Sequence, residues 1–232
     1  MFDMGDSGSL GATRVRLAAV LGRLAAPPVP PLPAFAPLPV MGLARGRVHE
    51  LPGPARRVLA AVLAGRAQGE GPVLWLRLDW GAERLCPQGL AAFGDPGALI
   101  TVGAPRAAEV LWAAEEALRS GAVALVIAEL ATNPDLRQIR RLHRAAAEGV
   151  ARATGRPGAG GTRRAPLGVL LMQDAAESCI AGVESRWALH PMPQVRGGLA
   201  EEPAWRLERR LARDAPPADW PLRRGERGLA MG

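Results

Sequence analysis

Residues 107–129 have the sequence AAEVLWAAEEALRSGAVALVIAE, in which an amphipathic helix is followed at once by a buried strand. Apolar side chains recur with the spacing of one helix face at Val110, Leu111, Ala114, Ala117 and Leu118. Gly121 is the type of residue that ends such a helix. The apolar run Val123–Ala128 is typical of a strand covered on both faces. Helix followed by buried strand is the repeat from which parallel sheets are built.

The same alternation extends on both sides of this stretch. Helices are predicted at residues 56–66 and 134–151, and strands at residues 72–78, 99–102 and 167–172. Asn133 and Pro134 supply a cap and a first-turn proline for the second of these helices. We therefore predict an α/β fold in which a mainly parallel sheet is flanked by helices on both faces.

The two ends of the chain differ from this core. Residues 1–40 combine a short helix, Thr13–Ala26, with the stretch 27–39, where seven of thirteen residues are proline. Proline fixes φ and lacks a donor, so this stretch is expected to be an extended spacer. The core is expected over residues 41–195. Residues 196–232 form a basic tail rich in Trp and Arg, expected either as short strands that pack on the sheet or as a segment that orders on a partner.

The charge of the chain comes from an unusual composition. All 29 basic residues are arginine; with 22 acidic residues the net charge is +7, and no lysine occurs. A lysine is essential to a standard phosphate loop, to a pyridoxal phosphate Schiff base and to a Ser-x-x-Lys acyl-enzyme. Enzymes that depend on these lysines are excluded.

Cysteine, histidine and the N-terminus indicate a cytoplasmic protein without a metal. Two cysteines, Cys86 and Cys179, do not make a disulfide framework. The three histidines are isolated from one another and lack the close spacing of zinc ligands. The apolar stretch Leu17–Ala26 is interrupted by Arg23, so neither a signal peptide nor a membrane span is expected.

Three segments taken in order resemble the core of the RecA recombinase over about residues 47–190. Val48–Pro54 is similar to the strand and Gly-Pro that lead into that family's phosphate loop. Residues 120–129 resemble its Ser-Gly-Ala-Val and the strand that ends in the Walker B acid, which places Glu129 at the acid's position. Leu167–Met172 followed by Gln173 is similar to the strand whose terminal glutamine senses nucleotide. The resemblance implies a RecA-like fold.

The chain departs from that family where nucleotide would bind. The Gly-Lys-Thr that should follow Gly53 and Pro54 is replaced by Ala55, Arg56 and Arg57. The glycine turn, the phosphate lysine and the Mg²⁺ hydroxyl are thereby lost, and a planar guanidinium does not reproduce a compact ammonium. Glu129 and Gln173 are then vestigial. We expect no cofactor and no catalytic residue.

A RecA-like chain of this length with a degenerate loop is similar to the ImuA family. Residues 71–77 and 111–119, and the Arg-Trp and Trp-Arg segments near 186 and 205, resemble that family's pattern. The resemblance implies a non-catalytic adaptor in SOS-induced translesion synthesis. Its partners would be an ImuB-type Y-family polymerase homologue and the RecA filament, and through them an error-prone replicative-type polymerase. The expected partner-binding residues are Arg186, Trp187, Trp205, Arg206, Arg209, Arg210 and Trp220.

Two other functions remain open at this level. A RecA-like ATPase would bind and hydrolyse ATP. A division inhibitor, related to the same shortened RecA-like fold, would bind the tubulin-like division GTPase. Arginine with tryptophan also suggests DNA contact, which is expected to be secondary because the charge is modest and most arginines have acids nearby.

Overall fold

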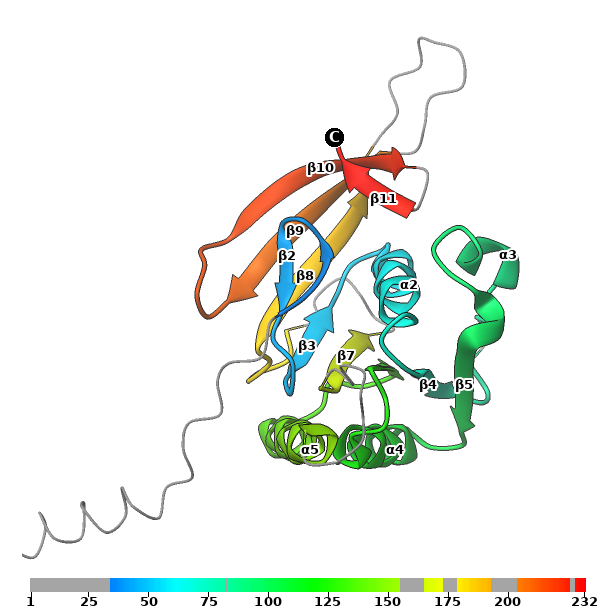
Figure 1. The fold of residues 1–232 in the computed structure, drawn as a ribbon, viewed down its shortest axis with the longest axis vertical. Coiled ribbons are helices and arrows are strands. Elements are labelled where there is room, and N and C mark those ends of the chain that lie inside the picture. Colours follow the sequence, from blue (N-terminus) through cyan, green and yellow to red (C-terminus); the bar gives the residue numbers. More distant parts are fainter. Residues whose placement is uncertain (1–33, 82, 155–164, 173–178, 193–203, 226–227) are drawn as a thin grey trace, which may run out of the picture. The chain divides into compact units, whose positions relative to one another are not determined.

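The computed structural model describes residues 34–81, 83–154, 165–172, 179–192, 204–225 and 228–232, and its main feature is one large sheet (Figure 1). Nine strands lie side by side in the spatial order β11, β10, β9, β8, β3, β7, β6, β4, β5. Their bounds in that order are Gly228–Met231, Ala218–Gly225, Ala204–Ala212, Ser185–Pro191, Val48–Leu51, Leu167–Met172, Leu125–Leu130, Val73–Leu78 and Leu99–Ala104.

The sheet has a parallel part and an antiparallel part. Strands β3, β7, β6, β4 and β5 pair in parallel, and β8 joins β3 in parallel at Glu50 and Arg186. Strands β8, β9, β10 and β11 pair antiparallel. The α/β fold with a mainly parallel sheet is confirmed, since the runs expected at 72–78, 123–128 and 167–172 form the buried strands Val73–Leu78, Leu125–Leu130 and Leu167–Met172.

One face of the sheet is covered by helix α2 (Arg56–Ala67) and by the hairpin of β1 (Phe35–Leu38) and β2 (Met41–Leu43). Alternate strand residues, including Trp75, Ile127 and Leu207, pack with them in one apolar core. This core reaches from the parallel strands into the antiparallel ones. The C-terminal strands therefore share the hydrophobic core of the parallel sheet.

The opposite face is covered by helices α4 (Ala107–Ser120) and α5 (Leu136–Thr154), which lie together beneath the sheet in Figure 1. Gly121 ends α4 with a φ of 63°, and a Cβ there would meet the carbonyl oxygen of Gly149 at 2.4 Å. Glycine is required at this position both by the backbone angle and by the close approach of α5. A short helix α3 (Pro87–Leu90) and a 3₁₀ turn (Pro96–Ala98) lie between β4 and β5.

The start of α5 differs from the expectation of an Asn133 cap. The helix begins at Leu136, and the Asp135 carboxylate accepts from the Gln138 N–H while the Gln138 side chain accepts from the Asp135 N–H, both at 2.8 Å. This reciprocal pair is a capping box, and it satisfies two backbone donors instead of one.

The ends of the folded unit also differ from the expected boundaries. A compact unit runs from Pro33 to Gly232, so it begins inside the proline-rich stretch and includes the C-terminal segment. Phe35 and Leu38 are buried, which makes the end of the proposed spacer part of the core. The predicted helix Thr13–Ala26 lies outside the described residues.

A buried histidine links the hairpin to the sheet. The Nε2–H of His49 donates to the Ala44 carbonyl at 3.0 Å, so its Nδ1 accepts from the Ser185 hydroxyl at 2.7 Å, and that hydroxyl accepts from the Trp187 indole at 3.1 Å. Burial lowers the pKa of His49 to about 4, against the Ala44 hydrogen bond that favours the charged form. His49 is therefore neutral in the folded protein at pH 7.

Acidification is predicted to destabilise the protein through His49. The unfolded chain takes up this proton below about pH 6.5 but the folded chain only near pH 4. The contribution of neutral His49 to the free energy of unfolding is therefore fully present above pH 6.5. It decreases by about 3 kcal/mol as the pH falls from 6.5 to 4. Urea unfolding at several pH values measures this. His49→Gln should remove most of the slope, and His143→Gln a smaller part, since burial also lowers the pKa of His143. An unchanged slope in His49→Gln would contradict the prediction.

Candidate functional site

The carboxyl ends of β3 and β6 bring together the two segments that resemble a phosphate-loop region and a Walker B strand. β3 ends at Leu51 and is followed by Pro52-Gly53-Pro54-Ala55 and then α2. On β6, Leu125 and Ile127 belong to the core under α2, so Glu129, two residues further, lies on the same face. The first turn of α2 and the end of β6 therefore face each other.

Arg57 and Glu129 form a bidentate ion pair across this gap. Arg57 Nε lies 2.9 Å from Glu129 Oε1, and Nη2 lies 2.6 Å from Oε2. The Trp75 indole N–H donates to the same Glu129 Oε1 at 2.8 Å, and Glu129 is only 4% exposed. The remaining Nη1 of Arg57 contacts Glu83 at 2.6 Å. Arg57, which follows the resembled phosphate-loop segment, and Glu129, at the resembled Walker B position, thus neutralise each other's charge.

The surroundings of Arg57 favour the charged form of its guanidinium. Burial by itself lowers the pKa of Arg57, but the hydrogen bonds and charge of Glu129 and the charge of Glu83 outweigh it, so the pKa is raised above the usual value. Arg56 and Arg57 occupy the first turn of α2, where the helix dipole disfavours a cation and no acid of the helix compensates. Glu129 and Glu83 provide that compensation from outside the helix.

The backbone of the loop is also occupied. Residues 52 and 54 are prolines, which have no N–H to offer a phosphate. The Ala55 N–H donates to the Leu189 carbonyl of β8 at 3.3 Å, and the Arg56 N–H donates to the Gly53 carbonyl at 3.3 Å. Gly53 has a φ of 100°, and a Cβ there would lie 3.4 Å from the Leu189 oxygen. The loop packs on β8 and does not present the row of free N–H groups that cradles phosphates.

Sequence reasoning identified Glu129 and Arg57 but missed Trp75, Glu83 and Arg77. Trp75 lies opposite Ile127 in the β4–β6 pairing, so its indole is on the face of Glu129. Arg77 is buried and donates to the carbonyls of Gly81 and Glu83 at 3.0 and 2.8 Å, which holds the loop that carries Glu83. The pairing register was the missing information, because it decides which residues of two strands are neighbours.

Several candidates of the C-terminal segment form an internal stack. Trp187 is 1% exposed and stacks on Trp220 with ring centroids 5.9 Å apart. The Arg209 guanidinium lies over both rings, 5.7 Å from Trp187 and 5.2 Å from Trp220. Arg186 binds the buried Glu50 at 2.5 Å. Trp187, Trp220, Arg209 and Arg186 therefore hold the sheet extension together.

The opposite face of β9 is open and carries the remaining arginines. Arg206 and Arg210 are exposed and both contact Glu208, at 2.8 and 3.0 Å. Partial burial raises the pKa of Glu208, but the Arg210 hydrogen bond and the surrounding cations outweigh it and hold that pKa below its usual value. These residues line a shallow hollow of about 280 Å³ with Arg209, Pro217, Ala218 and Asp219. Trp205 is half-buried and packs at the edge of the core.

The sequence predicts neither a metal site nor a membrane-spanning helix. Among the described residues no group of three or more His, Cys, Asp or Glu side chains is placed to hold a metal ion. None of the helices in the described part of the chain has the length and apolar content to cross a bilayer. Gln173, the expected end of β7, lies outside the described residues.

Comparison with known proteins supports the fold alone. The chain is similar to the solved structure titled "Crystal structure of the RadB recombinase", with a TM-score of 0.54 and 15% sequence identity over 82% of this chain and 93% of that one. No protein-family model matches the chain, and no curated protein matches its sequence. The chain therefore has the RecA-like fold of that recombinase, as the segments 48–54, 120–129 and 167–172 indicated.

Breaking the Arg57–Glu129 pair is predicted to destabilise the protein. Arg57→Met leaves a carboxylate under α2 without its cation, which should lower the free energy of unfolding by about 2–3 kcal/mol. Adding Glu129→Gln to this variant should recover most of the loss. Urea unfolding measures both. Arg66→Ala, an exposed arginine of the same helix, is the matched control and should change little; equal stability of Arg57→Met and Arg66→Ala would refute the role of the pair.

Proposed function

We propose that this chain is a non-catalytic accessory subunit of a translesion-synthesis complex in the DNA damage (SOS) response. The single observation that carries the proposal is the Arg57–Glu129 ion pair. It joins the residue beside the resembled phosphate loop to the residue at the resembled Walker B position, so neither side chain is free for nucleotide. The partners are those that the ImuA resemblance implies: an ImuB-type Y-family polymerase homologue, the RecA filament and, through them, an error-prone replicative-type polymerase. A RecA-like fold without its chemistry is suited to docking.

The ion pair argues against ATP hydrolysis. A RecA-like ATPase needs a lysine on the phosphates, a hydroxyl on Mg²⁺ and a free acid at the end of the Walker B strand. The chain has neither the lysine nor the hydroxyl, and Glu129 is bound by Arg57 and Trp75. Nucleotide would also have to displace the Leu189 carbonyl from the Ala55 N–H.

The edge of the parallel sheet supports docking to a RecA-like partner. β5 is the last strand of the sheet in the described residues, and it pairs with β4 alone. Ile100 is 49% exposed on this strand. An edge strand with unpaired backbone groups accepts a further strand from a partner.

The open face of β9 supports binding of the polymerase-like partner. Arg206 and Arg210 are exposed around the hollow at Glu208, and the half-buried Trp205 lies on the same strand. Arg and Trp are the residues that most often dominate protein interfaces. The stack of Trp187, Arg209 and Trp220 beneath keeps this face rigid.

Charge reversal on this face is predicted to release the polymerase-like partner. The double variant Arg206→Glu with Arg210→Glu and the matched control Arg66→Glu are each purified from damaged cells with their bound proteins. The full chain and the control should recover a Y-family-like protein and RecA. With the double variant, recovery of the Y-family-like protein should fall about tenfold and recovery of RecA should stay the same. Unchanged recovery by the double variant, or capture of the division GTPase, would contradict the proposal.

ATP binding is predicted to be absent. Titration of a fluorescent ATP analogue with Mg²⁺ should show no saturation up to millimolar concentration, because the groups that bind phosphate are missing or paired. Hydrolysis should equal that of the Glu129→Gln variant. Saturable binding together with turnover that Glu129→Gln abolishes would establish an ATPase in place of an adaptor.

A further inference from the structure

A groove lies between α4 and α5 on the face of the molecule that carries these helices. It has a volume of about 230 Å³ and is lined by Ala108, Leu111, Trp112, Glu115, Gln138, Arg141 and Leu142. The proposed polymerase-binding face on β9 includes none of these residues. The groove therefore belongs to neither the phosphate-loop region nor the C-terminal sheet.

The α4 side of the groove exposes a tryptophan. Trp112 is 61% exposed, whereas Val110, Ala114 and Leu118 of the same helix are buried against the sheet. Leu111 and Ala108 lie beside it in the groove, and Leu142 of α5 faces them. A large exposed aromatic ring beside aliphatic side chains is a common form of interface anchor.

The exposed face of α5 next to the groove is basic, beside the wall formed by Gln138, Arg141 and Leu142. Arg137, Arg141 and Arg144 are exposed and follow one another at i, i+4 and i+7 on one side of the helix, with Arg140 next to them. Arg141 is bound to Glu115 at 2.7 Å. For Arg137, Arg140 and Arg144 the described part of the chain provides no ion pair. Unpaired cations in a row favour an anionic partner.

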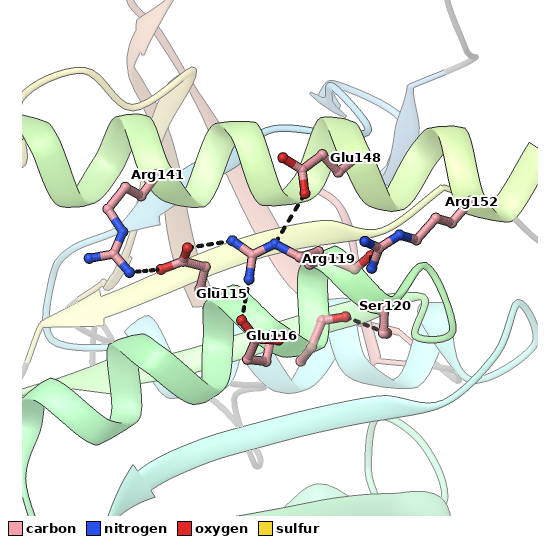
Figure 2. A network of polar contacts seen from close by, with 8 residues as sticks. Glu115, Glu116, Arg119, Ser120, Arg141, Glu148 and Arg152 are labelled. Carbon is pink, nitrogen blue, oxygen red and sulfur yellow. Dashed lines mark hydrogen bonds and ion pairs between the residues drawn. The ribbon is translucent and has the colours of Figure 1, made fainter.

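A network of ion pairs holds the two helices at a fixed spacing (Figure 2). Glu115 of α4 binds Arg141, and Arg119 binds Glu115, Glu116 and, at 3.1 Å, Glu148 of α5. Arg152 donates to the Arg119 carbonyl at 2.8 Å. Partial burial raises the pKa of Glu115, but the hydrogen bonds and charges of Arg119 and Arg141 outweigh it and hold that pKa below its usual value. The groove is therefore present before any partner binds.

We propose that this groove binds an acidic protein segment that carries an apolar anchor residue, most simply an amphipathic helix. The anchor packs on Trp112 and Leu111, and the acidic edge of the segment faces Arg137 and Arg144 on α5. This mode is the docking of a helix in a groove with charge complementarity along one side. The surface is separate from the C-terminal sheet, so it stands whether or not the polymerase-like partner binds there.

The charges of α4 favour a peptide over a single-stranded nucleic acid. Glu109 and Glu116 flank Trp112 on the outer face of α4 and pair with Arg106 and Arg119, so the cations beside the ring are already neutralised and would not hold a phosphate chain laid over it. Single-strand sites also use several aromatic rings, whereas Trp112 stands alone in this groove. The segment Thr13–Ala26 of this chain has three arginines and no acid, so its charge does not suit the groove.

The test selects peptides on the full chain. A displayed library of peptides of about 16 residues, with apolar positions at helical spacing and random charged positions, is selected on the protein and counter-selected on Trp112→Ala. The best peptide is then measured in solution with Arg137→Glu/Arg144→Glu, with Trp112→Ala and with the controls Arg66→Glu and Arg206→Glu/Arg210→Glu. Arg137 and Arg144 are exposed, so their reversal should leave the fold intact, which circular dichroism checks.

The proposal expects acidic peptides whose affinity falls about tenfold in both groove variants, falls with added salt and is unchanged in both controls. Failure to enrich any peptide that depends on Trp112 would overturn it, as would enrichment of neutral or basic peptides. A labelled oligothymidylate that binds with the same dependence on Arg137, Arg144 and Trp112 would show a nucleic-acid surface and would also overturn it.

Discussion

A carboxylate buried beneath helix α2 is the constraint on which this structure depends. Glu129 is almost inaccessible to water, and a charge in that position is stable only with a cation and a hydrogen-bond donor close to it. Arg57 supplies the cation and Trp75 the donor. The first turn of α2 is thereby tied to β6 and β4, and the helix dipole gains the negative charge that its own first turn lacks.

The same region joins the parallel and antiparallel parts of the sheet. The Ala55 N–H, at the start of α2, donates to Leu189 of β8, and β8 leads into the strands that carry the tryptophan and arginine stack. His49 adds a second link, because it reaches both the hairpin through Ala44 and β8 through Ser185. The position of the C-terminal strands thus depends on a loop that in a RecA-like ATPase would be kept free for phosphate.

Apart from this ion-paired centre, the described residues present several exposed surfaces. The arginines on the open face of β9, the edge strand β5, which pairs only with β4 among the described residues, and the groove at Trp112 lie on different elements. Such separation suits a protein that holds more than one partner at once, since two partners on distinct faces do not compete for the same residues. The rigid ion-pair network between α4 and α5 and the stacked rings under β9 keep two of these surfaces preorganised.

The sequence alone determined the local elements, the parallel core and the absence of a phosphate-loop lysine. Helix spacing at 107–120 and apolar runs at 123–128 and 167–172 are local properties, and the absence of lysine is a matter of composition. Only the tertiary structure decided that Arg57 meets Glu129, that Trp187 is buried and that Trp112 is exposed. These facts depend on which strands pair, in which register and under which helix. Residues 72 positions apart, as Arg57 and Glu129 are, become neighbours only through pairings that neither local sequence records.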